Sequence, residues 1–383
     1  MARLADIGKI ITGNTPKTSV TENYSSNDIC FVKPSDIIDG EITKINDSEF
    51  YISEYARQKS RILPPHSVMV TCIGIIGKVA INQVECAFNQ QINAIIPDEK
   101  KCMPIYLAYA IQYKQAALQD IANSPVVPIL NKSQFSNVEI TIPTLTQQQE
   151  AIVKLEKVVE LISLRKQQLS KLDELVKVRF VEMFGVYPYN EKGWKTCTIK
   201  DIVSDVRYGT SRPAVDGGTY PYLRMNNITY GGQLDLSDVK RIDIPENELS
   251  KCTVRRGDVL FNRTNSKELV GKTCVYDKDE MMVLAGFIIR VRVNEQTLPE
   301  FLSSFLNADF SKKMLLGMCK TAIGQANINA QELQGIELYL PPIMLQQEFV
   351  VFKTEVSRQK LTIQQSLDKL EVLKEALMQE YFG

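Results

Sequence analysis

The feature that most constrains this chain is an internal repeat, because a segment near its middle returns near its end. Residues 129–143 return as residues 327–341, and each copy then runs into Gln-Gln-Glu, at 148–150 and 346–348. Each copy ends at an aromatic residue followed by glycine, Phe184-Gly185 and Phe382-Gly383, which keeps the offset at 198 residues (382 − 184). A repeat of this length is a whole domain with a helix rather than one unit of a solenoid. We therefore expect two similar surfaces at a fixed separation, which suits the reading of something bipartite.

Two segments carry the heptad pattern of a long helix, residues 147–185 and residues 345–383. Apolar residues recur every seven positions, at Leu155, Ile162, Leu169, Val176 and Met183 in the first segment and at Phe349, Val356, Ile363, Leu370 and Leu377 in the second. Thr146 is followed three residues later by Gln149, a pattern typical of a capping box at a helix start. Heptads sustained over five repeats predict a coiled coil, and we expect the two helices to pack antiparallel. The alternative is that each helix packs alone on its own domain, but the heptad pattern is longer than packing against one globular domain would require.

The segments before the helices, residues 1–146 and 186–344, read as short strands broken by turns. Strands are predicted at residues 29–32, 67–70, 78–81, 220–223, 258–261 and 287–293, with helical segments at 104–120 and 299–318. The predicted fold class is α+β: two similar mixed α/β domains separated by two long antiparallel helices in a coiled coil, with a pseudo-twofold internal repeat. Between shared anchor segments the two domains differ in nearly every residue, as two half-sites of unlike content would require.

Composition limits the class of protein. The chain has no net charge, and its two β-rich halves carry 13 basic against 14 acidic residues and 20 against 19. Because phosphate contacts usually dominate nucleic-acid affinity, such a binder would need clustered basic residues or a partner that shares the backbone contacts. Eight cysteines are scattered without a CxxC motif, which favours buried reduced thiols in a cytoplasmic protein. No apolar run is long enough to span a membrane.

Residues for catalysis are missing from the sequence. The single histidine, His66, follows two prolines and reads as a turn residue, so chemistry of the nucleophile–histidine–acid kind is close to excluded. Residues 266–273 resemble the sequence motif of a phosphate-binding loop but lack its first glycine. The first half holds Gly77-Lys78 at the matching place, so the Gly-Lys pair is interpreted as a hairpin of the scaffold. We predict no catalytic residue, no metal site and no cofactor bound by this chain.

The order of variable domain, apolar-proline step, Gln-Gln-Glu and long helix, given twice, resembles the specificity (S) subunit of type I restriction–modification systems. The resemblance covers the whole chain, although the family often carries Glu-Gln-like pairs where this chain has Gln-Gln-Glu. It implies target-recognition domains at 1–146 and 186–344, each reading half of a bipartite double-stranded DNA target, and conserved spacer helices at 147–185 and 345–383. The helices would dock methyltransferase (M) subunits, beside a restriction/translocase (R) subunit. S-adenosylmethionine, ATP and magnesium would be bound only by those partners.

Polar loops at matching positions supply the candidate DNA-binding residues, because Asn, Gln, Ser, Thr, Arg and Lys make most base contacts. In the first domain these are Asn14, Thr15, Lys17, Lys33, Ser35, Asn89, Gln90, Gln91, Ser124 and Lys132. In the second they are Thr210, Ser211, Arg212, Arg224, Asn226, Asn227, Asn262, Arg263, Thr264, Asn265, Ser266, Gln325 and Asn327. The run 262–266 is the most suggestive, since five polar residues follow an apolar strand. Each loop could instead be a solvated surface loop.

Two classes of function stay open on the residues alone. The first is a DNA-reading, non-catalytic subunit, and the second is a pseudo-symmetric protein–protein adaptor without DNA binding. The adaptor would be expected to expose apolar or acidic tips where this chain has polar loops.

Overall fold

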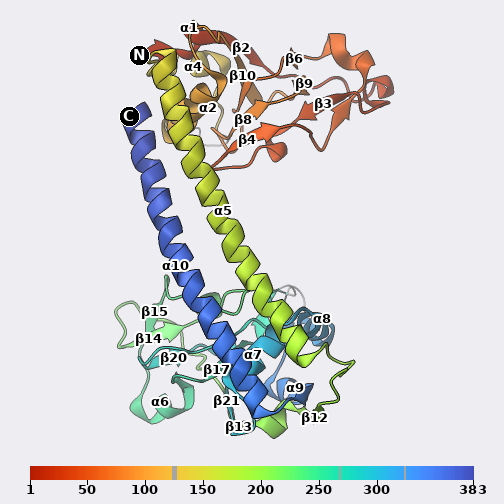
Figure 1. Ribbon diagram of the computed structural model, residues 1–383, viewed down its shortest axis with the longest axis vertical. Helices are drawn as coiled ribbons and strands as arrows, with labels where there is room; N and C mark the ends of the chain where they lie inside the picture. The colour runs from red at the N-terminus through yellow and green to blue at the C-terminus, as the bar shows by residue number, and fades with distance from the viewer. Residues whose placement is uncertain (123–126, 267–268, 323–324) are drawn as a thin grey trace. The chain divides into compact units, whose positions relative to one another are not determined.

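The computed structural model describes residues 1–122, 127–266, 269–322 and 325–383, which divide into two compact units. The first unit comprises Met1–Lys166 and Gln365–Gly383, and the second comprises Gln167–Gln364. Two long helices, α5 (Leu145–Phe184) and α10 (Ile343–Phe382), contribute residues to both units (Figure 1). This division follows compactness and cuts both helices, so the four-part domain division expected from the sequence stays a prediction.

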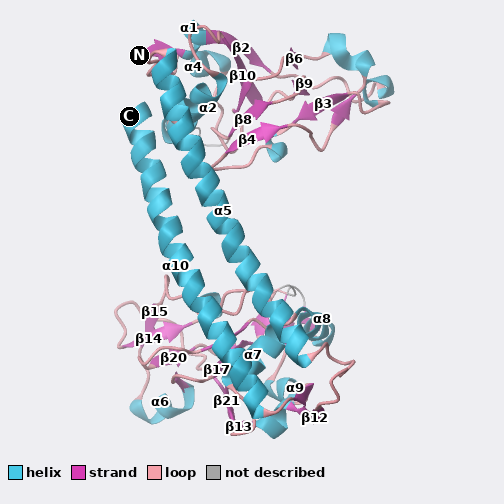
Figure 2. Cartoon of the chain, viewed as in Figure 1, coloured by secondary structure: helices cyan, strands magenta, loops and turns pink. Residues whose placement is uncertain are grey.

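The first unit contains two main sheets, which Figure 2 shows beside its helices. One has the strand order β2 (Gly8–Thr12), β10 (Ile92–Pro97), β7 (Val68–Thr71), β8 (Val79–Asn82) and β4 (Ile42–Ile45). The other has the order β5 (Tyr51–Ile52), β3 (Ile29–Val32), β9 (Cys86–Phe88) and β6 (Ile62–Leu63), and β1 (Ala2–Arg3) pairs with β11 (Glu139–Ile140). The helices are α1 (Leu4–Ile7), α2 (Pro104–Tyr113), α3 (Gln115–Ile121) and α4 (Lys132–Ser136), with 3-10 turns at Thr21–Tyr24, Pro34–Asp36 and Glu54–Lys59.

The second unit repeats this plan. One sheet has the order β13 (Val203–Tyr208), β21 (Ile288–Val293), β17 (Val259–Asn262) and β19 (Thr273–Val275), and another has β15 (Lys240–Ile242), β14 (Tyr220–Leu223), β20 (Met282–Leu284) and β16 (Thr253–Val254). Smaller sheets join β12 (Lys195–Thr198) to β24 (Glu337–Leu340) and β18 (Thr264–Asn265) to β23 (Gln325–Asn327) and β22 (Lys320–Ala322). The helices are α6 (Glu246–Cys252), α7 (Pro299–Asn307), α8 (Asp309–Met318) and α9 (Ala330–Gln334), with 3-10 turns at Ile199–Ile202 and Met225–Asn227.

All six strands expected from the sequence are present, four of them starting one residue later than predicted. Each expected helical segment is instead two helices. α2 and α3 meet at Lys114, and α7 and α8 meet at Ala308, whose backbone is extended. Apolar periodicity runs across both breaks, which is why the sequence did not show them.

The long helices anchor in the cores of the units at a repeated aromatic contact. In the first unit, Phe382 of α10 packs on Tyr106 of α2 with ring centroids 5.0 Å apart. In the second unit, Phe184 of α5 packs on Phe301 of α7 at 5.1 Å. The aromatic-glycine ends seen in the sequence are therefore buried anchors, because each last aromatic ring fills the core next to the first helix after the main sheet.

A buried glutamine anchors the other end of each helix. Gln148 accepts a hydrogen bond from the Met103 amide at 2.8 Å and donates to two backbone carbonyls. Gln346 accepts from the Leu298 amide at 2.9 Å and from the Thr297 hydroxyl at 3.0 Å, and also donates to two carbonyls. Both side chains are fully buried. The repeated Gln-Gln-Glu thus supplies, at its first position, a polar link between the helix and its domain.

The predicted cap of α5 was wrong by two residues. The helix begins at Leu145, and the amide and hydroxyl of Thr144 donate to Gln147 Oε1 at 3.1 and 2.9 Å. Thr144–Gln147 and Thr146–Gln149 have the same spacing, and the earlier pair acts because the helix starts directly after Pro143.

Within each unit the helix segments pack antiparallel, as the heptads predicted. In the first unit, Lys154 donates to the Tyr381 hydroxyl at 2.8 Å, and Lys166 pairs with Glu371 at 3.3 Å. In the second unit, Asp173 pairs with Lys360, and the rings of Phe180 and Phe349 lie 5.3 Å apart. All ten heptad positions are buried or half-buried. The lone-helix alternative is therefore wrong, and the fold class is confirmed.

Candidate nucleic-acid interface

The polar loops of each unit meet at one turn held by the same backbone hydrogen bonds. The turn joins β9 to β10 at residues 89–91 in the first unit and β20 to β21 at residues 285–287 in the second. In the first unit the backbone bonds run from Asn89 N to Val32 O (3.1 Å), from Cys72 N to Gln91 O (2.8 Å) and from Gly13 N to Ile92 O (3.0 Å). In the second unit the equivalent bonds, in the same order, run from Ala285 N to Leu223 O (2.9 Å), from Arg263 N to Phe287 O (2.9 Å) and from Gly209 N to Ile288 O (3.1 Å). We call these two places the reading turns. One backbone framework therefore presents different side chains in the two units.

A glycine closes each reading turn for a steric reason. A Cβ on Gly13 would lie 2.0 Å from the carbonyl oxygen of Asn89, and a Cβ on Gly209 would lie 2.2 Å from that of Leu284. Only glycine permits this approach of two backbones. The repeated loop glycine seen in the sequence is thus needed to bring the neighbouring loop against the turn.

In the first unit, several predicted residues gather at the reading turn. The Thr15 hydroxyl donates to Gln90 Oε1 at 2.6 Å, and Asn14 holds the neighbouring segment through Lys59 O and the Arg61 amide, both at 2.8 Å. Lys33 lies 3.0 Å above the ring of Phe50. The side chains of Lys17, Ser35 and Lys132 are exposed, and Ser124 lies outside the described residues.

Three of the predicted asparagines are buried. Asn89 donates to Gln91 Oε1 at 2.9 Å, and Asn227 donates to the Asp235 and Asp238 carbonyls at 2.8 and 3.1 Å. Asn262 is fully buried, and neither side-chain atom has a hydrogen-bond partner in the described part of the chain. Satisfied buried amides hold loops in place, so Asn89 fixes the first reading turn through Gln91, and Asn227 fixes the neighbouring segment at residues 235–238.

In the second unit, six predicted residues line one cavity of about 440 Å³: Thr210, Ser211, Arg212, Arg224, Asn226 and Arg263. Tyr222, Ala285, Gly286 and Phe287 are also in its wall. These residues come from four separate stretches of the chain, at 210–214, 222–226, 263 and 285–287, and share a wall because the reading turn draws the strands together. Three guanidinium groups in one cavity make a concentrated donor surface.

The three arginines of this cavity differ in their partners. Arg212 forms a two-pronged pair with Glu248 at 2.8 and 3.2 Å, and Arg224 pairs with Asp238 at 2.8 Å. Arg263 stacks over the ring of Tyr208 at 4.8 Å and donates to the Gly286 carbonyl at 3.5 Å. Arg263 has no carboxylate partner among the residues that the structure describes, and its Nε is buried without a partner there. The Nε of Arg224 is also buried without a partner, so what sets Arg263 apart is that no carboxylate among the described residues pairs with it.

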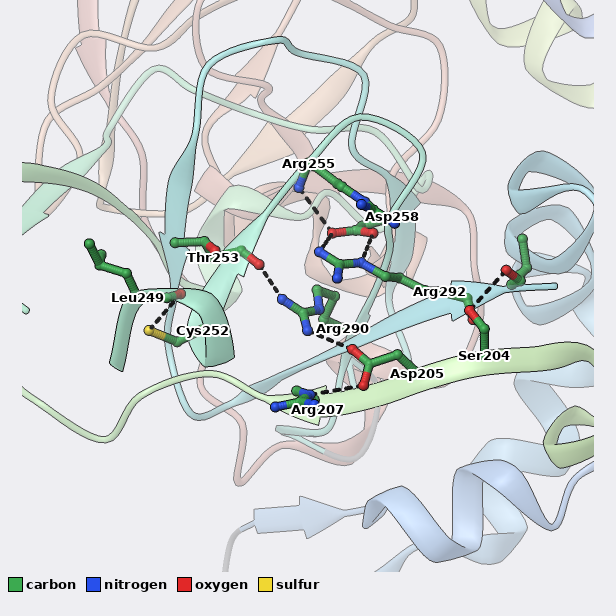
Figure 3. A network of polar contacts seen from close by, with 11 residues as sticks. Ser204, Asp205, Arg207, Leu249, Cys252, Thr253, Arg255, Asp258, Arg290 and Arg292 are labelled. Atoms are coloured by element: carbon green, nitrogen blue, oxygen red, sulfur yellow. Dashed lines mark hydrogen bonds and ion pairs between the residues drawn. The ribbon is translucent and has the colours of Figure 1, made fainter. Parts of the chain in front are cut away.

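Other arginines of the second unit are committed to its interior, as Figure 3 shows. Arg290 is buried and pairs with Asp205 at 2.6 Å, and Arg292 forms two bonds to buried Asp258 at 2.8 and 3.2 Å. The bonds to Asp258 raise the pKa of Arg292. Since a buried charge is costly unless it is paired, these pairs hold the sheet together and keep both guanidinium groups bound to carboxylates of the same unit.

The remaining predicted residues lie on the small sheet after β17. The Thr264 hydroxyl donates to Asn327 Oδ1 at 3.1 Å across the β18–β23 pair, and Asn265 Oδ1 accepts from the Ser266 amide at 2.9 Å. Gln325 lies on β23. The run 262–266 is thus partly a strand edge rather than an open loop.

Sequence reasoning missed three residues at the reading turns. Phe287 is 50% exposed at the tip of the second turn, and Tyr208 stacks on Arg263. In the first unit, Arg61 is exposed and its guanidinium donates to the Thr12 carbonyl. Aligning Gln91 with Phe287 through the repeat could have found Phe287, because the first of the pair was already a candidate.

The features considered for catalysis have structural roles. His66 is exposed in a turn with positive φ, and its amide donates to the Asn82 carbonyl at 2.7 Å. Lys78 and Lys272 both follow hairpin glycines and donate to backbone carbonyls, of Ile37 at 3.0 Å and of Met225 at 2.9 Å, which confirms the hairpin interpretation. Residues 267 and 268 of that second stretch lie outside the described residues. Burial raises the pKa of the Cys86 and Cys102 thiols to about 12, which leaves them unreactive.

Two kinds of feature are absent from the described ranges of the chain. No cluster of three or more His, Cys, Asp or Glu side chains there could hold a metal ion. No helix there combines the length and the apolar character needed to cross a bilayer.

Solved structures show the same fold. A chain from a study of complex assembly and conformational transition of the type I R-M system superposes with a TM-score of 0.62 over 99% of this chain and 96% of its own, at 18% identity. The type I restriction-modification system S subunit from M. genitalium superposes with a TM-score of 0.56 over 100% and 95%, at 12% identity.

Curated relatives agree at the level of sequence. The EcoKI specificity subunit of Escherichia coli (strain K12) is 22% identical over 91% of this chain and 80% of its own length. The StySPI specificity subunit of Salmonella potsdam is 22% identical over the same shares. The family profile described as the type I restriction modification DNA specificity domain matches residues 1–174 and again 191–372, once for each half of the repeat. The chain therefore belongs to this family, the DNA specificity subunits of type I restriction–modification systems, which are non-catalytic within their complexes.

Proposed function

We propose that each reading turn reads one half of a split, asymmetric DNA sequence. The observation that carries this proposal is the shared backbone framework with unlike side chains. Gln91, Cys72 and Lys33 in the first unit stand where the second unit has Phe287, Arg263 and Arg224. Equal frameworks would approach two stretches of DNA in the same way, and unlike side chains would select different bases.

In the second unit, Arg263 is the proposed base reader. A guanidinium with free donors suits the two acceptors that guanine shows in the major groove. Stacking on Tyr208 holds the planar group in one orientation, which lowers the entropic cost of binding. Arg212 and Arg224 are held by carboxylates and would position the DNA backbone, while exposed Phe287 offers an apolar contact to a thymine methyl group.

In the first unit, the proposed readers are Gln90, Gln91 and Thr15 at the turn, with Lys33, Lys17 and Lys132 as phosphate contacts. Amide side chains suit adenine, which shows one donor and one acceptor in the major groove. The first unit would therefore read its half-site mainly through amides and the second through a guanidinium. Asn89 and Asn227 are assigned to loop support, because their amides are already used inside the protein.

We further propose that the exposed apolar side chains of the long helices dock the methyltransferase subunits. In the first unit these are Leu145, Val153, Leu161, Leu164, Val372 and Leu373, and in the second Leu175, Val178, Val181, Met344, Val351 and Leu361. An exposed apolar stripe is typical of a surface that a partner covers. On this proposal the partners bind S-adenosylmethionine and share the phosphate contacts, which accounts for the zero net charge of this chain.

The experiment is methylation-site sequencing of the reconstituted complex with Arg263→Ala. If Arg263 reads a guanine, discrimination at one position of one half-site should fall by about 1–3 kcal/mol, and the other half-site should be read as before. Arg256→Ala is the matched control, because this exposed arginine pairs with Asp279 and lies outside the cavity lining.

Three results would count against the proposal. Relaxed recognition in both halves would make Arg263 a structural residue, and a uniform loss of binding with the motif unchanged would make it a phosphate contact. Sequence-independent behaviour of the whole complex would favour the adaptor alternative.

A further inference from the structure

The second unit holds a larger cavity, of about 780 Å³, that the reading of DNA does not use. It lies between α5, α7, α8 and α10, and the segment around residues 230–233 completes its wall. Its aromatic lining includes Phe180, Tyr187, Tyr189, Tyr230 and Phe310. The volume is in the range of cavities that bind small molecules, about 300–1,000 Å³.

Positive charge is concentrated in this cavity. Five lysines line it, Lys177, Lys312, Lys313, Lys353 and Lys360, against the two aspartates Asp173 and Asp309. The aspartates pair with Lys360 and with Lys177, the latter at 3.2 Å. Three ammonium groups are left without a carboxylate partner in the described part of the chain, although the whole protein is electrically neutral.

Two of these three lysines are held inside the wall by neutral groups. Lys312 donates to the Gly271 carbonyl at 2.8 Å, and Lys353 donates to the Ser304 hydroxyl at 3.0 Å. Burial lowers the pKa of Lys312 to about 8 and also lowers that of Lys353. The nearby carboxylate of Glu300 offsets part of this effect at Lys353. Because a half-buried ammonium group without an ion-pair partner destabilises a fold, an occupant that supplies negative charge would relieve both lysines.

The first unit shows that the fold does not need this polarity. Ser304 lies three residues after the core ring Phe301, where the first unit has Tyr109 three residues after Tyr106. Lys353 lies seven residues after the buried Gln346, where the first unit has Leu155 seven residues after Gln148. Tyr109 and Leu155 are both buried core residues. The second unit thus has a small serine and a charged lysine where the first has a bulky core tyrosine and a leucine, and both Ser304 and Lys353 line the cavity.

We propose that this cavity binds a small phosphate-bearing molecule with a planar ring, of the nucleotide class. The ammonium groups of Lys312 and Lys353 would bind the phosphate, with the Ser304 hydroxyl beside them. Tyr230, whose ring lies 5.5 Å from Lys312 Nζ, and Tyr187 provide aromatic faces for the ring. The site is independent of the proposed base readers, because none of them lines it.

The experiment measures binding to the full chain by calorimetry and by thermal shift. The probes are adenosine 5′-monophosphate, adenosine triphosphate, inorganic phosphate and uncharged adenosine, with sulfate as an ionic-strength control. We expect the two nucleotides to bind and to raise the melting temperature, inorganic phosphate to bind at least tenfold more weakly, and adenosine not to bind.

Two variants borrow the residues of the first unit. Lys353→Leu removes the ammonium group, and Ser304→Tyr fills the cavity while keeping the lysine, so each should weaken nucleotide binding at least tenfold. Lys278→Leu is the control, because this exposed lysine pairs with Asp277 outside the cavity. If Lys353→Leu fails to fold by circular dichroism, Ser304→Tyr decides the question.

Each remaining outcome overturns the proposal in whole or in part. No binding of any phosphate-bearing probe, or unchanged binding in a folded cavity variant, overturns it. Equal binding of inorganic phosphate and nucleotides overturns the assignment of the ring site, and equal binding of sulfate reduces the cavity to a general anion site.

Discussion

Replacing Gln346 by leucine tests whether the repeated buried glutamine fastens each helix to its domain. The side chain makes four hydrogen bonds, two accepted and two donated, and it is fully buried. Leucine keeps much of the volume but leaves the Leu298 amide and three other groups without a partner. At about 1 kcal/mol for each net hydrogen bond, the loss should be roughly 3–4 kcal/mol.

Native-state hydrogen exchange is the suitable assay, because a chain of two compact units need not unfold in one step. Exchange of the Leu298 amide, which bonds Gln346 Oε1 directly, should accelerate by roughly 10²–10³-fold if the opening free energy falls by that amount. The matched control is Gln347→Leu, since Gln347 is the exposed neighbour and its substitution should change stability by less than about 0.5 kcal/mol.

The first unit offers an internal comparison. Gln148 makes three bonds rather than four, so Gln148→Leu should cost roughly 2–3 kcal/mol and act on the amide of Met103. If Gln346→Leu lowers stability no more than Gln347→Leu does, the hydrogen bonds of the buried glutamine do not stabilise the chain and the reasoning is refuted.

Three further predictions concern charge in the interior. Leu169→Asp or Ile363→Asp should place an unpaired charge on the half-buried helix seam and cost several kcal/mol, and wild-type melting temperatures for both would show that the seam is misassigned. Arg292→Met should leave Asp258 buried and unpaired and cost about 3–5 kcal/mol in urea denaturation; a neutral result would contradict the assigned ion pair. Lys312 has a pKa of about 8 in the folded chain, below the ordinary lysine value of 10.5, so the unfolded chain binds more protons between those pH values and stability should rise with pH through that window. Lys312→Met should remove this rise and stabilise the chain at pH 7 in phosphate-free buffer by about 2–3 kcal/mol, whereas an identical pH profile in the variant would refute the assignment.

The amino-acid sequence by itself determined the repeat, the two long helices, their antiparallel pairing and most of the strands. These features depend on local periodicity. The heptad positions, such as Leu155 and Val356, show which helix face is buried even when the element that packs against it is unknown. Because the chain contains a repeat, each of these patterns occurs twice, and the two copies support the same prediction. The residues that catalysis would need are missing from the sequence, and its repeated order of domain and helix resembles the family to which the chain belongs.

The tertiary structure alone decided which polar residues are available. Asn227 and Asn262 look like loop readers in the sequence, yet they are buried, because strands from distant parts of the chain close over them. Arg212 and Arg263 look alike until Glu248 is found beside one and Tyr208 beside the other. Burial, ion pairing and stacking depend on residues that are tens of positions apart in the sequence. The local sequence pattern does not show which of these distant side chains come into contact.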